Sequence, residues 1–238
     1  MPWPVVDFAA FGPTEIQPLP RFTQFAAGVL TRNWVMIPHV THHDELDITE
    51  LEELRKRKHV EAARRVTLLP FLIKAVVSVL KAFPQFNASL DGKNLVLKRY
   101  FHIGIAVDTP LGLLVPVIRD VDKKTVEQLT VEIAADTEQA RSKGLPISKM
   151  SGGSFSISSL GSIGGTGFTP IIIAPEVAIL GVTRAQRKPI DMEGKLAWRT
   201  MLPVSLSYDH RAINGADAAR FCVALGTALK DAKNMAGA

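Results

Sequence analysis

The residues most able to do chemistry lie near the C-terminus, in the segment Ser205–Phe221, which reads SLSYDHRAINGADAARF. This segment places His210 and Asn214 four positions apart, between an apolar strand pattern and a helix pattern. An ordinary imidazole has a pKa near 6.5, which suits a general base at neutral pH. Histidines at strand ends are often structural. From its position alone, His210 is therefore no more than a candidate general base.

A second polar segment holds a candidate hydrogen-bond donor. Ser158 ends the strand pattern Phe155–Ser158, which runs into the glycine-rich stretch Gly161–Gly167. A serine hydroxyl can donate a hydrogen bond to an oxyanion that forms during a reaction. Several other serines lie nearby, and a hydroxyl that only satisfies the backbone is the alternative interpretation.

Several common signatures are missing from the sequence. It contains no Gly-x-x-x-x-Gly-Lys phosphate loop and no Gly-x-Ser-x-Gly elbow. His39, His42 and His43 lack the spacing of a His-Glu-x-x-His helix, so we expect polar side chains on a strand face and no metal site. The single cysteine, Cys222, excludes a cysteine cluster for zinc, and we expect it in the core rather than as a nucleophile.

The elements that must position these residues are helices and strands that alternate along the chain. Thr49 and Glu52 have the spacing of a capping box, and Asp91-Gly92 is a hairpin signal. Mixed hairpins and long helices favour an α/β (α+β) fold, with a mixed sheet and helices packed on it. The expected helices are 49–64, 67–84, 125–143 and 215–233, and the expected strands are 86–90, 95–99, 102–107, 113–118, 155–158, 177–182 and 201–207.

Composition limits the possible functions. The 238 residues are 47% hydrophobic and 21% charged, as in ordinary globular proteins, and the net charge is only +5. That charge does not indicate nucleic-acid binding, and no apolar stretch reaches the roughly 20 residues that a membrane span needs. Residues 1–20 contain five prolines and are expected to form an extended arm before a domain over 21–238.

Taken as a whole, Ser205–Phe221 resembles the active-site signature of the dihydrolipoyl acyltransferases, the core components of 2-oxo acid dehydrogenase complexes. Chloramphenicol acetyltransferase carries a related His-x-x-x-Asp-Gly. Further segments resemble this family in the same order, and the branch they resemble most is the acetyl-transferring, pyruvate-complex branch. These segments are 32–41, which looks like the family's early strand, 106–119, 153–161 with 164–170, and 175–181.

The resemblance implies a two-layer sandwich like that of chloramphenicol acetyltransferase, forming an obligate trimer. It implies transfer of an acetyl group from S-acetyl-dihydrolipoyl-lysine to coenzyme A. His210 would activate the coenzyme A thiol, and Ser158 of a neighbouring subunit would stabilise the tetrahedral oxyanion. Asn214 stands where aspartate is commoner, so it can orient a neighbour but cannot supply charge. The candidate substrate contacts are Asp108, Thr166, Gly167 and Phe168.

The resemblance also implies partners. Coenzyme A and lipoyl-lysine are expected as substrates, with the lipoyl domain outside this chain. We expect a homotrimer able to assemble into a cubic 24-mer in the cytoplasm of a bacterium. Pyruvate dehydrogenase and dihydrolipoamide dehydrogenase components would dock through domains outside this chain. No metal, nucleic acid or membrane partner is expected.

Other functions remain open at this point. A serine hydrolase that uses Ser158 and His210 would react with a serine-directed phosphonate, although the missing elbow argues against it. A non-catalytic scaffold of the same fold would organise a 2-oxo acid dehydrogenase complex without turnover. A nucleic-acid binder would need a clustered basic face.

Overall fold

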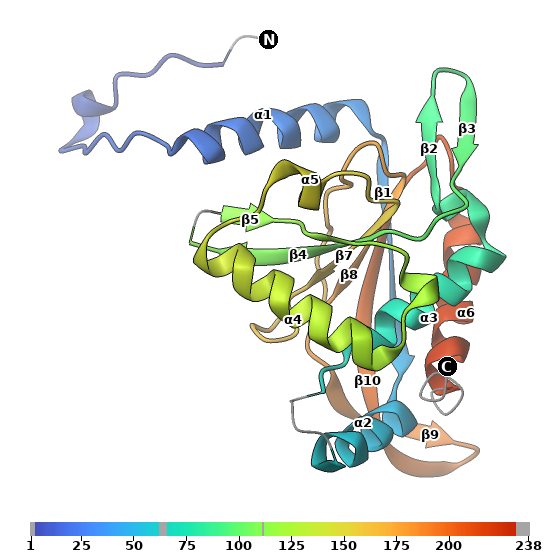
Figure 1. The fold of residues 1–238 in the computed structure, drawn as a ribbon. Helices are drawn as coiled ribbons and strands as arrows, with labels where there is room; N and C mark the ends of the chain where they lie inside the picture. The colour runs from blue at the N-terminus through green and yellow to red at the C-terminus, as the bar shows by residue number, and fades with distance from the viewer. Residues whose placement is uncertain (1–2, 62–65, 111, 232–238) are drawn as a thin grey trace.

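The computed structural model describes residues 3–61, 66–110 and 112–231, and its centre is one large mixed sheet (Figure 1). The sheet strands are β1 (His39–Asp47), β4 (Ile103–Thr109), β5 (Gly112–Leu114), β6 (Val117–Ile118), β7 (Phe155–Ser159), β8 (Ala178–Val182), β9 (Gln186–Met192) and β10 (Lys195–Asp209). Their order is β1-β10-β8-β7-β4-β5, with β6 paired to β4 and β9 to β10. The β4–β7 and β7–β8 pairs are parallel, and the other pairs are antiparallel. The sequence-based prediction of a mixed sheet with packed helices is therefore confirmed.

The remaining elements surround this sheet. A separate hairpin joins β2 (Ala88–Asp91) to β3 (Asn94–Leu97) at Gly92, whose φ of 56° favours glycine. The hairpin expected at Asp91-Gly92 is thus confirmed. The helices are α1 (Arg21–Met36), α2 (Thr49–Glu61), α3 (Leu69–Ala82), α4 (Val126–Ser142), α5 (Ile147–Met150) and α6 (Gly215–Lys230), with 3₁₀ turns at Phe8–Phe11, Pro84–Phe86 and Val121–Lys123. No helix in the described part of the chain is long and apolar enough to cross a bilayer.

One face of the sheet is closed by helices. Residues Ile105, Ile157, Leu180 and Leu206 form one row across four strands, and all are buried in the main core. Helices α3, α4 and α6 pack over them, as Figure 1 shows. Phe221 of α6 anchors this layer, because its ring lies against several other buried or half-buried rings. The partners are Phe83, Phe86 and Phe155, with ring centroids 6.0, 4.5 and 6.1 Å from that of Phe221.

The opposite face of the sheet is polar. Successive residues of a strand point to opposite faces, so the next row is turned away from the helices. This row crosses five strands, and we call it the polar row. Its members are Ala106, Ser158, Gly181, Ser205 and His43. A small apolar cluster of Ile37, Ile172 and Ile179 lies on this face, where the segment 160–175 crosses it.

Three details differ from the sequence-based predictions. Residues 32–36 form the end of helix α1, and the strand β1 begins only at His39. Trp34, Val35 and Ile37 are good strand formers, but the helical hydrogen bond from the Ile37 N–H to the Asn33 carbonyl is still made. Thr49 and Glu52 form no capping box, because Thr49 donates to the Asp47 carboxylate and Glu52 pairs with Arg55. The long β9–β10 hairpin was not predicted: the expected strand covers only residues 201–207 of β10 and leaves out β9. Expected helix residues 62–64 and 232–233 lie outside the described residues.

The N-terminal arm projects from the sheet. Residues 3–20 contain a single 3₁₀ turn, and α1 begins at Arg21. The arm extends away from the body of the molecule in Figure 1. Its large apolar side chains are almost all exposed, including Trp3, Val5, Phe8 and Phe11. Exposed apolar side chains do not stabilise an isolated chain, and they commonly mark a surface that packs against another molecule.

Candidate active site

His210 lies in a tight connection between β10 and α6. The chain turns directly after Asp209, whose carbonyl accepts hydrogen bonds from the N–H groups of Ala212 and Ile213. The N–H of His210 itself donates to the Pro38 carbonyl at 3.1 Å, and its side chain is exposed. The backbone of His210 is therefore fixed while its imidazole stays accessible.

An ion pair holds the two neighbours of His210 together. The Asp209 carboxylate is buried and accepts from Arg211 at 2.9 Å (Nε to Oδ1) and 2.6 Å (Nη2 to Oδ2). Such two-pronged contacts fix geometry as well as charge. The Asp209 carboxylate also raises the pKa of Arg211. This pair further restrains the turn that carries His210.

Asn214 begins helix α6. Its Oδ1 accepts the N–H of Asp217 at 2.8 Å, which makes it the N-cap of the helix. Asparagine and aspartate are both good N-caps, because each offers a side-chain oxygen to the free N–H groups of the first turn. Capping alone thus accounts for the residue type at 214, and the amide Nδ2 is left to contact a ligand or a neighbour.

Ser158 lies inside strand β7, as part of the polar row. It pairs with Ala106 on one side and Gly181 on the other, and it is half-buried. A serine in mid-strand does not have the sharp strand-to-helix turn of a hydrolase nucleophile. This position suits a hydrogen-bond donor better than a nucleophile.

One chain does not bring Ser158 and His210 together. Ser158 is level with Gly181 and Ser205, whereas His210 lies five residues farther along the chain than Ser205. Five residues at about 3.3 Å each, with two strand spacings of about 4.8 Å, place the backbones roughly 19 Å apart. Neither side chain is long enough to meet the other at one reacting group. The geometry therefore also argues against a hydrolase dyad within a single chain.

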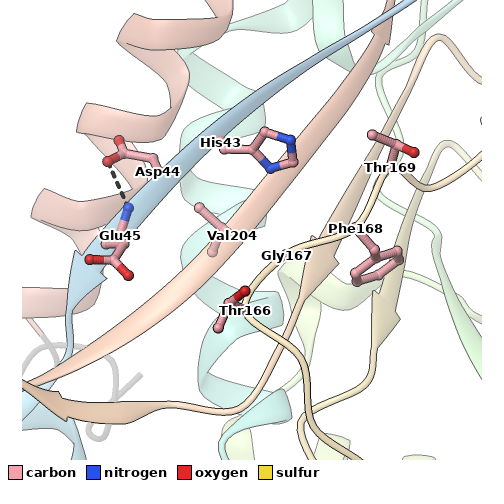
Figure 2. A pocket seen from close by; sticks show the side chains of 8 residues that line it. All are labelled: His43, Asp44, Glu45, Thr166, Gly167, Phe168, Thr169 and Val204. Atoms are coloured by element: carbon pink, nitrogen blue, oxygen red, sulfur yellow. Dashed lines mark hydrogen bonds between the residues drawn. The ribbon is translucent and has the colours of Figure 1, made fainter.

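Three of the four candidate substrate contacts gather beside the polar row. Thr166, Gly167 and Phe168 line a hollow of about 590 Å³ together with His43 (Figure 2). The Phe168 N–H donates to Ser205 Oγ at 3.4 Å, and that oxygen lies 2.9 Å from His43 Nδ1. The sequence-based grouping of these three residues agrees with this arrangement, although their contact with a substrate stays a prediction.

The ring of Phe168 explains a glycine in the polar row. A Cβ atom on Gly181 would lie 2.8 Å from Phe168 Cζ and 3.2 Å from the Ser205 carbonyl. Gly181 pairs with Ser158 in the sheet. A side chain at position 181 would therefore push Phe168 away from this part of the polar row. The glycine at 181 thus allows the segment 160–175 to approach Ser158.

Asp108 lies apart from that hollow. It is exposed near the end of β4, two residues beyond Ala106, which pairs with Ser158. Together with Thr109, Pro110 and Arg141 it lines a separate hollow of about 470 Å³. Asp108 therefore shares a sheet face with Ser158 but not a pocket with the other three candidates.

The segment 160–175 is tied to helix α1 and to the start of β1 by one side chain of each. The Ile172 N–H donates to His39 Nε2 at 3.0 Å, and Asn33 Nδ2 donates to the Ile172 carbonyl at 3.0 Å. His39 Nδ1 lies 2.9 Å from the Ile37 carbonyl, so its proton is on Nδ1 and Nε2 is the acceptor. His39 is thus a structural histidine on a strand, as the sequence analysis expected.

The polar face also holds a buried carboxyl group that was not predicted from the sequence. Burial raises the pKa of Glu176 to about 8, and the nearby charge of Lys98 offsets only part of this effect. Burial also lowers the pKa of Lys98. Glu176 and Lys98 line a cavity of about 780 Å³ beside Ser156. The motif 175–181 contains this glutamate, but only the fold shows that it is buried.

Comparison with known proteins gives consistent matches. Residues 11–236 match the family described as the 2-oxoacid dehydrogenases acyltransferase (catalytic domain). The dihydrolipoyllysine-residue acetyltransferase component of the pyruvate dehydrogenase complex of Cupriavidus necator is 54% identical over 97% of this chain. The chain spans only 42% of that relative's length.

Solved structures give the same result. The dihydrolipoamide acetyltransferase of Azotobacter vinelandii is 52% identical with a TM-score of 0.94, and 98% of each chain is covered. The structure of the Azotobacter enzyme was determined to study the role of a serine, a histidine and an asparagine in its catalytic mechanism. The serine and the histidine are 52 residues apart, and the asparagine follows the histidine by four residues. The cubic core of a pyruvate dehydrogenase complex matches with the same TM-score, identity and coverage. Chloramphenicol acetyltransferase, 13% identical with a TM-score of 0.53, covers 85% of this chain and 94% of its own and shares the fold.

Proposed function

The chain belongs to the family of 2-oxoacid dehydrogenase acyltransferase catalytic domains, and on that premise we propose that it transfers an acetyl group from S-acetyl-dihydrolipoyl-lysine to coenzyme A. Residues 21–238 are the proposed catalytic domain, and residues 1–20 are its arm. In the assembled complex the reaction would supply acetyl-coenzyme A from the pyruvate dehydrogenase reaction.

One observation carries this proposal. Ser158, His210 and Asn214 are a serine, a histidine and an asparagine separated by 52 and four residues. The residues investigated in the catalytic mechanism of the Azotobacter enzyme have the same types and the same two separations. Agreement in type, order and spacing at 52% identity supports the same roles here.

The chemistry fits these side chains. A free thiol has a pKa near 8.5, only about two units above that of an imidazole. Neutral His210 can therefore accept the coenzyme A thiol proton as sulfur attacks the thioester carbonyl. Ser158 then donates a hydrogen bond to the tetrahedral oxyanion. The intermediate breaks its bond to the dihydrolipoyl sulfur, which takes the proton back from His210, so one thioester replaces another.

Asn214 has a different proposed role from the other two residues. Its Oδ1 is used by the first turn of α6, so it fixes the start of the helix directly after the His210 turn. An amide cannot balance an imidazolium by charge. We therefore assign Asn214 as a positioning residue that acts through the start of α6.

The proposed working unit is a homotrimer. Ser158 and His210 are too far apart within one chain, so a complete site needs Ser158 of one subunit and His210 of another. The exposed apolar arm also supports association, because packing on a neighbour would bury its side chains. A chain that starts at Arg21 should form smaller or less stable oligomers, and unchanged size and melting temperature would refute this role of the arm.

Higher assembly and partners belong to the same proposal. The structural match to a cubic core supports assembly of trimers into a 24-subunit cube. The acetyl group would arrive on a lipoyl domain, and pyruvate dehydrogenase and dihydrolipoamide dehydrogenase components would dock through further domains. We place the protein in the cytoplasm of a bacterium, in keeping with its bacterial relatives.

Acetyl transfer between acetyl-coenzyme A and dihydrolipoamide tests the proposal, with the parent chain and His210→Ala assayed side by side. A general base contributes about 10²–10⁴-fold, so kcat should fall by that factor in the variant. Sizing and circular dichroism should be the same for both proteins. A trimeric parent without turnover would contradict the proposal and favour the non-catalytic scaffold.

A further inference from the structure

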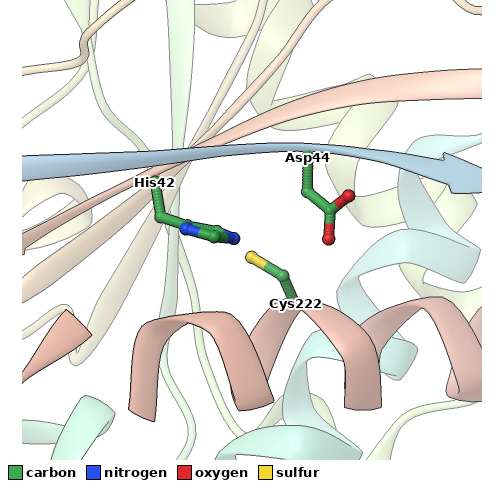
Figure 3. Close-up of side chains that lie close together, drawn as sticks. All are labelled: His42, Asp44 and Cys222. Atoms are coloured by element: carbon green, nitrogen blue, oxygen red, sulfur yellow. The ribbon is translucent and has the colours of Figure 1, made fainter. Parts of the chain in front are cut away.

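We infer that His42, Asp44 and Cys222 form a binding site for a thiophilic divalent cation such as Zn²⁺, on the helix-covered side of strand β1. One donor atom of each of these residues lies within 4.8 Å of the others. Figure 3 shows His42 and Asp44 reaching from β1 toward α6, with the Cys222 sulfur pointing between them. None of these residues takes part in the proposed acetyl transfer.

The alternation of strand β1 selects these donors. His42 and Asp44 are two residues apart on β1 and their side chains reach toward α6 (Figure 3), whereas His43 belongs to the polar row on the other face. Asp44 also borders the hollow of about 590 Å³, together with His43 and Glu45 (Figure 2). His39 is also unavailable, because both of its ring nitrogens are used by backbone groups. Of the three neighbouring histidines, only His42 faces the cysteine.

The ring of His42 has no competing role. Among the described residues, no side-chain or backbone group forms a hydrogen bond with either of its ring nitrogens, and its side chain is half-buried. Asp44 keeps one oxygen in a hydrogen bond from the Glu45 N–H at 2.7 Å, which orients the carboxylate. Outer hydrogen bonds of this kind hold metal-binding carboxylates in place.

The donor set and its dimensions suit zinc. Imidazole nitrogen, thiolate sulfur and carboxylate oxygen are the three donor types that Zn²⁺ binds, at about 2.0–2.3 Å. In a tetrahedron, such bonds place neighbouring donors about 3.3–3.6 Å apart. Donors already within 4.8 Å reach that spacing by small side-chain rotations, and water completes the fourth position.

Charge and access fit as well. The Cys222 thiol must lose its proton to bind a cation, because the thiolate is the metal ligand. Binding exchanges the thiol proton, which leaves to solvent, for the cation. One thiolate and one carboxylate then neutralise the two positive charges. The site lies at the sheet edge, because β1 is the terminal strand, and His42 and Asp44 are only half-buried.

Cobalt titration of the metal-stripped full chain tests the site. Co²⁺ bound by a thiolate gives a charge-transfer band in the near ultraviolet, and tetrahedral Co²⁺ gives intense visible bands. Because Cys222 is the only cysteine, a thiolate band reports this site alone. We expect one Co²⁺ per chain with both signals, and displacement of Co²⁺ by added Zn²⁺.

Matched variants separate the site from adventitious binding. His42→Asn and Asp44→Asn should each weaken binding about tenfold or more, and Cys222→Ala should abolish the charge-transfer band. His43→Asn, one residue away on the opposite face, should bind Co²⁺ like the parent. Circular dichroism checks the fold of each variant. The inference is wrong if the folded parent gives no thiolate band, or if His42→Asn and Asp44→Asn bind as tightly as His43→Asn.

Discussion

The face of the sheet under α3, α4 and α6 buries a nearly continuous apolar layer, whereas the opposite face carries Ser158, Ser205 and His43 in the polar row. The second face is covered only in part, by the segment 160–175 and a small isoleucine cluster. It also contains the buried carboxyl group of Glu176. The helix face thus accounts for most of the buried core, and the polar face leaves polar groups accessible for the proposed ligand and second subunit.

The largest effect should come from the helix face. Phe221→Ala removes a fully buried ring that contacts Phe86 and Phe155, and such truncations cost about 3–5 kcal/mol. Denaturant unfolding should show this loss, while kcat per folded site stays near that of the parent. A loss below about 1 kcal/mol would mean that the helix layer is not the main source of stability.

Ser158→Ala should show the reverse pattern. Removal of one oxyanion donor typically lowers kcat about 10²–10³-fold, so we expect a loss in that range. The free energy of unfolding should change by less than about 1 kcal/mol, because the hydroxyl is half-buried and the strand is retained. Ser159→Ala, the next residue of β7 and on the opposite face of the sheet, is the matched control. Equal losses of kcat in the two variants would remove the special role of Ser158.

Glu176 makes the stability of the polar face depend on pH. The carboxyl is protonated in the folded chain up to a pKa of about 8, but ionises near pH 4.3 once unfolded. Its contribution to stability is therefore complete below about pH 4 and is lost as the pH rises through about 8. Glu176→Gln should remove a decline on the order of 4 kcal/mol between pH 5 and pH 8, since one pKa unit corresponds to about 1.4 kcal/mol. Parallel stability curves for parent and variant would contradict the raised pKa.

Asn214 should give the smallest effect. Asn214→Ala removes the side-chain cap of α6 and should cost about 1 kcal/mol of stability, whereas Asn214→Asp should keep the cap. Thermal unfolding of both variants compares these costs. An equal loss in the two variants would show that the cap does not explain this residue.

Much of the fold could be predicted from sequence, because local patterns are strong where one face is buried. The helix at 126–142 and the Asp91-Gly92 hairpin follow from capping, glycine and periodicity. Helix α1 was not predicted, because its last residues belong to the segment 32–41, which resembles a strand, and only Asn33 among its residues is buried. The β9–β10 hairpin is likewise exposed over most of its length.

The candidate site residues and their placement on two different subunits were expected from the resemblance alone. The distance between Ser158 and His210 within one chain follows only from strand register. Glu176 and the grouping of Cys222 with His42 depend on contacts between distant segments. Local sequence carries no signal for such contacts.

The most direct test of the shared site is complementation between inactive chains. His210→Ala and Ser158→Ala chains are co-expressed, and the mixed oligomers are assayed for acetyl transfer. Random mixing pairs an intact His210 with an intact Ser158 of a neighbour in about a quarter of the sites, so about a quarter of the parent activity should return. Co-expression of His210→Ala with a chain that lacks both side chains is the control, and should give only residual activity. Mixed oligomers no more active than the two variants alone would contradict the account.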